Sequence, residues 1–158
     1  MIKYLSLILL FTTLNAQTFT YLLPDEYSTF IAEITQMSKN HPITILTSTM
    51  NHLSLKKILL KNTTKGYPLT LITSTPKNDP ASLIAYKNVE LTLYDKRKLE
   101  GTSILIDTLY GCQLSTSLDE EILLNTTQIV FCSDEPAFIS TMDKEFQTLQ
   151  KRSHSYLK

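Results

Sequence analysis

Glycine is scarce in this chain, and its scarcity excludes the commonest nucleotide-binding loops. The 158 residues include three glycines, Gly66, Gly101 and Gly111, which lie far apart. A phosphate loop and a dinucleotide fingerprint each need several glycines within a few residues, so that the backbone can approach phosphate groups. There is also no Gly-x-Ser-x-Gly turn, which excludes the elbow that presents a nucleophilic serine.

Metal-binding patterns are missing as well. The chain has two cysteines, Cys112 and Cys132, and three scattered histidines, His41, His52 and His154. The cysteines do not form a Cys-x-x-Cys pair, and no two histidines have the spacing typical of zinc ligands. The sequence therefore predicts neither a metal site nor a bound cofactor.

Neither sign of charge is in excess. Fifteen Lys and Arg residues balance fifteen Asp and Glu residues over the full chain. Broad nucleic-acid binding needs a basic face that neutralises phosphates and releases counterions, so we do not expect extensive nucleic-acid contact. Two short clusters remain candidates for a local basic patch: Lys56-Lys57 with Lys61, and Lys96-Arg97-Lys98.

Long apolar runs are absent except at the start, where residues 1–16 predict a cleaved signal peptide. Lys3 supplies the positive charge, residues 4–11 are mostly apolar, and Ala16 suits the position before a cut, although bulky Leu14 leaves the exact site open by one or two residues. An uncleaved anchor is the alternative, but a spanning helix needs about 20 apolar residues. We expect residues 17–158 to form one exported domain, periplasmic or secreted, with no membrane span after cleavage.

The two cysteines both lie in the predicted mature chain. In an oxidising compartment an even number of cysteines favours a disulfide, here Cys112 with Cys132. Two separately buried thiols are the alternative, because free cysteine is among the most buried residue types.

Hydrophobic periodicity predicts strands that alternate with helices, followed by consecutive strands and a closing helix. The expected strands are 18–23, 43–47, 69–73, 89–93, 103–107, 112–117 and 128–132. Helices are expected over about 25–39, around residues 55–59 with an end at Gly66, near 81–86, and after a cap at Ser133 or Asp134. This order predicts an α/β protein, a three-layer α/β/α sandwich with a mixed β-sheet.

The order of these elements, together with the stretch Leu99–Asp107, resembles the phospholipase D superfamily and its small secreted nuclease-like branch. When the family's His-x-Lys-x-x-x-x-Asp motif is laid on the chain without a gap, its three residues fall on Glu100, Thr102 and Asp107. The resemblance covers nearly all of residues 26–152 and implies a phospholipase D-like fold.

The later motifs of the family continue in the same register. Its Gly-Ser-x-Asn falls on residues 114–117, which places Ser115 at the serine and Ser117 at the asparagine. Its Asn-x-Glu falls on Asn125-Thr126-Thr127.

The substitutions bear directly on activity. In the family, the motif histidine attacks phosphorus and the lysine neutralises the phosphate oxygens. Glu100 would repel a phosphodiester, and Thr102 brings no charge. The resemblance therefore implies a vestigial site made of Glu100, Thr102, Asp107, Ser115 and Ser117, in a pseudoenzyme retained for binding or assembly. For Asp107 and Ser115 the alternatives are a turn residue and a strand-surface serine.

Rescue of catalysis requires another residue, and His52 is the histidine best placed for it. It follows the predicted strand 43–47, at the edge where open α/β sheets usually bind ligands. A helix cap or a surface residue is the alternative for His52.

Single-motif relatives pair two half-sites, so the resemblance also implies a homodimer and a phosphodiester ligand. An active phosphodiesterase or endonuclease with altered catalytic residues, and an unrelated exported α/β binding domain, are the competing hypotheses.

Overall fold

A large mixed β-sheet forms the middle of the molecule. The computed structural model describes residues 16–74 and 82–156 of the chain, so the predicted leader lies outside the described residues except for Ala16. The strands are β1 (Thr18–Leu23), β2 (Ile43–Thr47), β3 (Met50–Asn51), β4 (Leu69–Thr73), β5 (Val89–Leu93), β6 (Thr102–Ile106), β7 (Tyr110–Leu114), β8 (Leu118–Asp119), β9 (Gln128–Ser133) and β10 (His154–Ser155). The helices are α1 (Tyr27–Met37), α2 (Leu53–Thr64), η1 (Leu83–Ala85), α4 (Glu120–Asn125) and α5 (Pro136–Arg152).

The sheet has a parallel half and an antiparallel half. Its strand order is β1-β9-β7-β6-β2-β4-β5-β10. Strands β2, β4 and β5 are parallel to one another, whereas all the other pairs in this sheet are antiparallel. Parallel neighbours require crossover connections, which the segments holding α2 and η1 supply.

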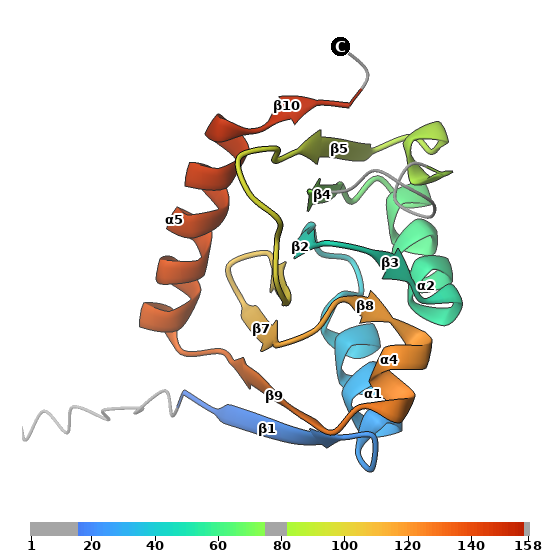
Figure 1. Ribbon diagram of the computed structural model, residues 1–158, viewed down its shortest axis with the longest axis vertical. Coiled ribbons are helices and arrows are strands. Elements are labelled where there is room, and N and C mark those ends of the chain that lie inside the picture. Colours follow the sequence, from blue (N-terminus) through green and yellow to red (C-terminus); the bar gives the residue numbers. More distant parts are fainter. Residues whose placement is uncertain (1–15, 75–81, 157–158) are drawn as a thin grey trace, which may run out of the picture.

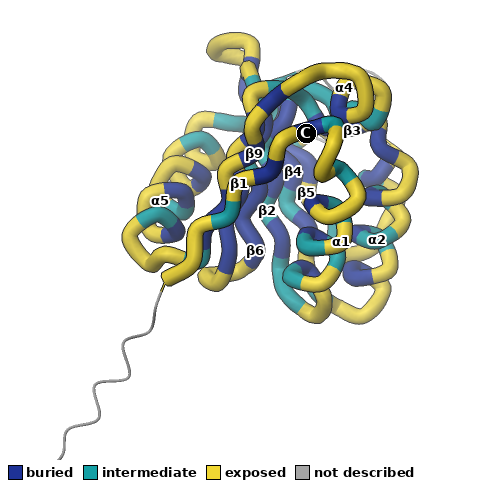
Figure 2. Tube along the Cα trace, turned by 90° about the horizontal axis from the view of Figure 1, so that it is seen from below, coloured by how far each residue is buried: buried dark blue, intermediate teal, exposed yellow. Residues whose placement is uncertain are grey.

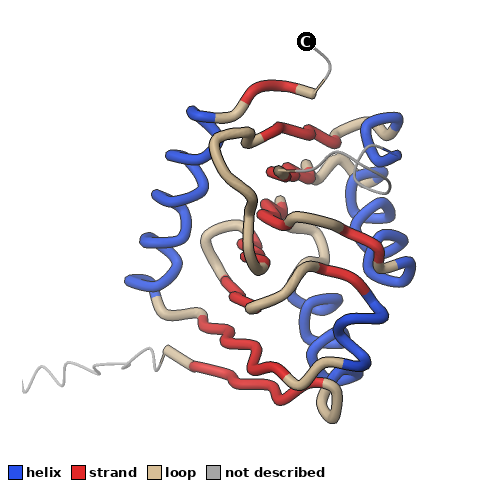
Figure 3. The backbone as a smooth tube through the Cα atoms, in the orientation of Figure 1, coloured by secondary structure: helices blue, strands red, loops and turns tan. Residues whose placement is uncertain are grey.

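Helices cover both faces of the sheet. In Figures 1 and 2, α5 lies along one face and α1 and α2 lie along the other, with the buried strands between them. Figure 3 shows the same three layers coloured by secondary structure. The expected three-layer α/β/α sandwich with a mixed sheet is therefore confirmed. Within the described ranges, no helix has the length and apolar character needed to cross a membrane.

Each helical layer seals its own apolar core against the sheet. The larger core lies on the α1–α2 side and includes Phe30 and Ile34, four residues apart on one face of α1. The smaller core packs Ile139, Met142 and Phe146 of α5 against the other face. Gly111 of β7 permits this close approach, because a Cβ there would lie 2.5 Å from the Met142 sulfur.

The start of α5 differs from the expectation. The helix begins at Pro136, not after a cap at Ser133 or Asp134. Ser133 is the buried last residue of β9, and its Oγ accepts a hydrogen bond of 3.0 Å from the Glu135 amide. Proline suits the first turn of a helix because that turn leaves backbone N–H groups unpaired in any case.

Short elements escaped the sequence-based prediction for a physical reason. The two-residue strands β3 and β8 pair in parallel with each other outside the main sheet, and β10 pairs with β5. Two residues carry no periodicity, so only the tertiary structure reveals them. The helix expected near 81–86 is the 3₁₀ turn η1, and Ala81 lies outside the described residues.

The structure joins Cys112 and Cys132 in a disulfide. The two residues lie directly opposite each other on β7 and β9, with their Cα atoms 4.1 Å apart. Both are fully buried, and they are 20 residues apart in sequence. The bridge therefore ties β7 to the strand that carries β1 at the sheet edge.

Removal of the bridge should destabilise the fold. We expect the Cys112→Ala/Cys132→Ala variant to lose about 2–4 kcal/mol of unfolding free energy, because a crosslink restricts the unfolded chain. Urea denaturation of both proteins measures this loss. Treatment with reductant should destabilise the native protein and leave the variant unchanged; equal sensitivity of the two proteins would contradict the role given to the bridge.

Candidate functional site

One edge of the sheet collects four of the five positions expected at the site. Thr102, the first residue of β6, lies opposite Thr47 on β2 and opposite Leu114 on β7. Glu100 comes just before this point, and Ser115 and Ser117 come just after β7. A Cβ on Gly101, whose φ is +77°, would lie 2.5 Å from the Leu114 carbonyl oxygen. The chain segments around Glu100 and Ser115 therefore approach closely.

Asp107 does not belong to this group. It follows the far end of β6, roughly 16 Å from Thr102 at about 3.3 Å per residue. There it adopts a φ of +53°, its amide bonds to the Pro42 carbonyl at 2.9 Å, and its carboxylate lies 3.4 Å from His41 Nδ1. Its expected place in the site is corrected: Asp107 shapes the turn at the opposite edge.

Thr102, to which the resemblance gives the place of a lysine, has a buried hydroxyl. Its Oγ1 lies 2.9 Å from Thr47 Oγ1 and 2.7 Å from the Thr116 carbonyl, and Thr47 Oγ1 lies 2.8 Å from the Thr49 carbonyl. The hydroxyl protons of Thr47 and Thr102 are thus shared among these three contacts. Thr47 Oγ1 also accepts a bond of 3.3 Å from the Leu118 amide. These hydroxyls are used within the protein, and Thr102 is only 3% exposed.

Glu100, by contrast, is exposed and lines an open hollow of about 660 Å³. We call this hollow the basic cleft, because Arg97, Lys98 and Arg152 line it with Glu100. Arg152 is the last residue of α5, so the fold adds a third cation to a short run that precedes the site in sequence. No ion pair joins Glu100 to these cations in the part of the chain that the structure describes.

Gln128 adds an uncompensated donor at the same edge. Its Oε1 accepts a hydrogen bond of 2.9 Å from Thr116, while its Nε2 is buried without a partner among the described residues. An unpaired buried donor costs about 1–3 kcal/mol. Packing alone does not explain why this Gln128 donor is buried here.

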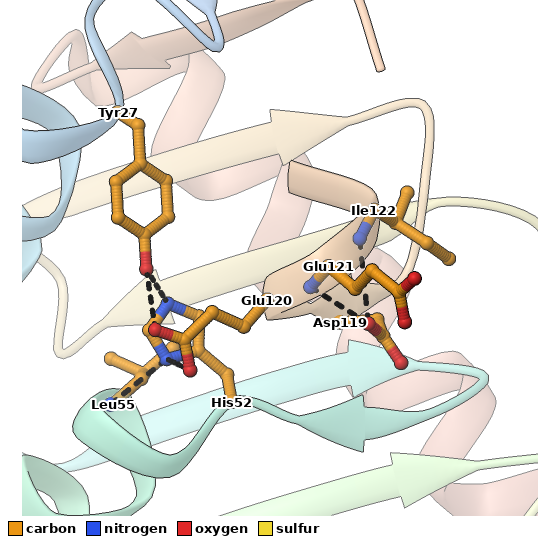
Figure 4. Close-up of polar contacts among 7 residues, drawn as sticks. All are labelled: Tyr27, His52, Leu55, Asp119, Glu120, Glu121 and Ile122. Carbon is orange, nitrogen blue, oxygen red and sulfur yellow. Dashed lines mark hydrogen bonds and ion pairs between the residues drawn. The ribbon is translucent and has the colours of Figure 1, made fainter. Parts of the chain in front are cut away.

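His52 lies near this edge but is closed off. It caps α2: its Nδ1 accepts a hydrogen bond of 3.1 Å from the Leu55 amide, so the proton is on Nε2. Nε2 is 2.9 Å from the Tyr27 hydroxyl, which donates in turn to Glu120 at 3.3 Å (Figure 4). His52 is 0% exposed.

Burial favours the neutral forms of both His52 and Tyr27. Burial lowers the pKa of His52, against an opposing effect of Glu120, and burial followed by Glu120 raises the pKa of Tyr27 to about 12. Both ring nitrogens of His52 are occupied, since Nδ1 accepts and Nε2 donates. The structure gives the cap interpretation of His52 and provides no free nitrogen for catalysis.

The cap predicts a dependence of stability on pH. Because the pKa of His52 is lower in the folded protein than its usual 6.5, the unfolded chain takes up a proton first as the pH falls. Its contribution to stability is complete above about pH 6.5 and decreases below that value. Urea unfolding measured at pH 7.5 and at lower pH values tests this.

Two variants separate His52 from the other titrating groups. His52→Asn keeps a capping oxygen but does not titrate, so this part of the pH dependence should disappear. His41→Asn, at the opposite edge, should retain it. An identical pH profile for wild type and His52→Asn would refute the assignment.

Among the residues that the structure describes, no three His, Cys, Asp or Glu side chains are grouped as metal ligands would be. The groups available for chemistry at this edge are cations, hydroxyls and carboxylates. The cations of the basic cleft can bind an anion, but no described group there provides a free imidazole nucleophile.

Comparison with solved structures decides the fold. NucT from Helicobacter pylori superposes with a TM-score of 0.80 at 13% identity, over 89% of this chain and 99% of that one. Nuc from Salmonella typhimurium, a phospholipase D family member, gives 0.75 at 11% identity over 89% and 98%. The chain has the phospholipase D-like fold. The nuclease-like architecture is thus matched over nearly the whole length of both structures.

A third structural match covers part of a larger protein. TrmBL2, an archaeal chromatin protein with a novel mode of DNA binding, gives a TM-score of 0.60 at 14% identity, over 87% of this chain and 53% of that one. No protein-family model matches the chain, and no curated protein sequence does either. The likeness is therefore one of three-dimensional structure at very low sequence identity.

Sequence reasoning missed the residues that come from distant parts of the chain to lie beside His52 and the cations before β6. Tyr27 of α1 and Glu120 of α4 enclose His52. Arg152 of α5 lines one hollow with Arg97 and Lys98, which precede β6. No sequence signal placed the end of α5, which carries Arg152, beside residues 97–100.

Proposed function

We propose that this protein is an exported phospholipase D-like pseudoenzyme that binds a phosphodiester ligand without cleaving it. The observation that carries the proposal is the replacement of the family's attacking histidine and lysine by Glu100 and buried Thr102. A carboxylate repels the phosphodiester, and a hydroxyl committed to internal hydrogen bonds offers no charge to the developing transition state.

The basic cleft supports a retained binding role. Arg97, Lys98 and Arg152 line the same hollow as Glu100, to which the resemblance gives the place of the attacking histidine. Guanidinium groups favour bidentate contacts with phosphate. The near-neutral chain fits a contact with few phosphates and not a broad nucleic-acid surface. The structural likeness to TrmBL2, a chromatin protein that binds DNA, is in keeping with this role.

Export and pairing are further parts of the proposal. The leader at residues 1–16 supports export to the periplasm or the outside of the cell, and the resemblance supports a symmetric homodimer. Sedimentation equilibrium of the mature chain, residues 17–158, should give twice the mass of one chain. A monomer mass at every concentration would contradict the pairing.

The test of the proposed function measures cleavage and binding together. Wild-type protein should not hydrolyse bis-p-nitrophenyl phosphate or DNA above the buffer rate, yet it should bind a short single-stranded oligonucleotide at low salt by fluorescence anisotropy. The Arg97→Gln/Arg152→Gln variant should bind more weakly. The slope of log affinity against log salt should become shallower by about 0.7 for each phosphate that the variant no longer neutralises.

Lys61→Gln/Lys65→Gln is the charge-matched control, because these lysines lie on the other face of the sheet. It should change the slope less than Arg97→Gln/Arg152→Gln does. Hydrolysis that His52→Ala or Glu100→Gln abolishes would instead establish an active phosphodiesterase with altered catalytic residues. Absence of oligonucleotide binding would contradict the binding role.

A further inference from the structure

The groove between α1 and α2 carries a lysine cluster that the proposed function does not use. A hollow of about 200 Å³ is lined by Lys39, just after α1, and by Lys61 and Lys65 at the end of α2. No carboxylate is among the lining residues. We call this hollow the lysine hollow. It lies in the α1–α2 layer, whereas the basic cleft involves α5 on the other face of the sheet.

The neutral total of the chain conceals a basic segment around this hollow. Between Ile34 and Asn88 there is a single acidic residue, Asp79, and there are seven lysines. The lysines are Lys39, Lys56, Lys57, Lys61, Lys65, Lys77 and Lys87, of which Lys77, like Asp79, lies outside the described residues. Opposite charges that balance the chain are therefore elsewhere in the sequence.

The lysines of the hollow are not neutralised by acidic side chains. The ion pairs among the described residues involve His41 and His52, and none involves Lys39, Lys61 or Lys65. Lys57 and Lys61 are also four residues apart on α2, where like charges repel each other. An anion in the hollow would relieve this repulsion.

The helix dipoles of α1 and α2 offset only part of the positive charge of the three lysines. Helices α1 and α2 both end beside the hollow, and each C-terminus carries about half a negative charge. Together they offset about one of the three lysines. A surplus of about two positive charges remains, which matches a dianionic phosphate.

The buried side chain of Asn62 joins the loop after α1 to α2. Asn62 donates from Nδ2 to the carbonyls of Ser38 and His41, at 2.9 and 2.8 Å, and accepts from the Asn40 amide at 3.0 Å. Lys65 Nζ bonds to Asn40 Oδ1 at 3.4 Å. The loop that carries Lys39 is therefore fixed against α2, which keeps the backbone of the three lysines around one hollow.

We propose that the lysine hollow binds a phosphate group, either free or on a lipid headgroup. Compact, strongly hydrated ammonium groups on flexible stems bind phosphate as point charges, and the hollow is large enough for one such group. This proposal is independent of the proposed function, because it uses other residues on the other face of the sheet.

Inorganic phosphate is the first probe. In an NMR titration against chloride at equal ionic strength, we expect saturable shifts of the amides of residues 38–41 and 61–66. Lys61→Gln/Lys65→Gln should weaken binding by roughly tenfold or more, about 1.4 kcal/mol. The charge-matched Arg97→Gln/Arg152→Gln control should keep the shifts of residues 38–41 and 61–66, with the same midpoint as wild type. The spectra themselves report whether each variant is folded.

Vesicles distinguish the source of the phosphate. Co-sedimentation with phosphatidic acid in phosphatidylcholine, absent with phosphatidylcholine alone and abolished in Lys61→Gln/Lys65→Gln, would assign the site to a lipid phosphate. Phosphate shifts without vesicle binding would assign it to a free phosphate. The proposal would be overturned if residues 38–41 and 61–66 gave no saturable shifts up to about 20 mM, or if their shifts survived in the lysine variant.

Discussion

The antiparallel pairing of β6 with β2 is the contact on which the rest of the structure depends. It joins the parallel half of the sheet, formed by β2, β4 and β5, to the antiparallel half, formed by β6, β7, β9 and β1. It also sets Thr47 directly opposite Thr102. One register therefore decides both the continuity of the sheet and the identity of the groups at the candidate site, because a slip by one residue would turn every side chain of β6 to the other face.

At the same edge, side chains near the expected site make structural contacts within the protein. Where the resemblance places a lysine, Thr102 completes a buried set of hydroxyl contacts with Thr47 and the Thr116 carbonyl. Nearby, His52 caps α2 through Nδ1, and its Nε2 is hydrogen-bonded to the Tyr27 hydroxyl. Groups that are fully hydrogen-bonded inside the protein stabilise it, but they cannot also bind a substrate. The cations Arg97, Lys98 and Arg152 line the exposed basic cleft.

Charge is also distributed unevenly between the two helical layers. The zero net charge of the sequence argued against extensive nucleic-acid contact and left two local clusters of cations as candidates. In the fold, however, cations gather at two separate places, the basic cleft beside α5 and the lysine hollow between α1 and α2. A sum over the chain says nothing about local potential, because interactions between exposed charges are screened within about 10 Å at ordinary salt.

The sequence by itself determined the layers and most of the strands. Runs such as Ile43–Thr47 and Leu69–Thr73 are short, apolar and rich in β-branched residues, which is typical of buried strands. It also placed Glu100 and Thr102 in register with a known motif. It did not separate Asp107 from that group, since five residues of strand carry a side chain to the opposite edge. Only the tertiary structure decided that His52 is enclosed by Tyr27 and Glu120, and that Arg152 lines the same hollow as Arg97. These contacts join residues far apart in the chain, and local periodicity contains no information about them.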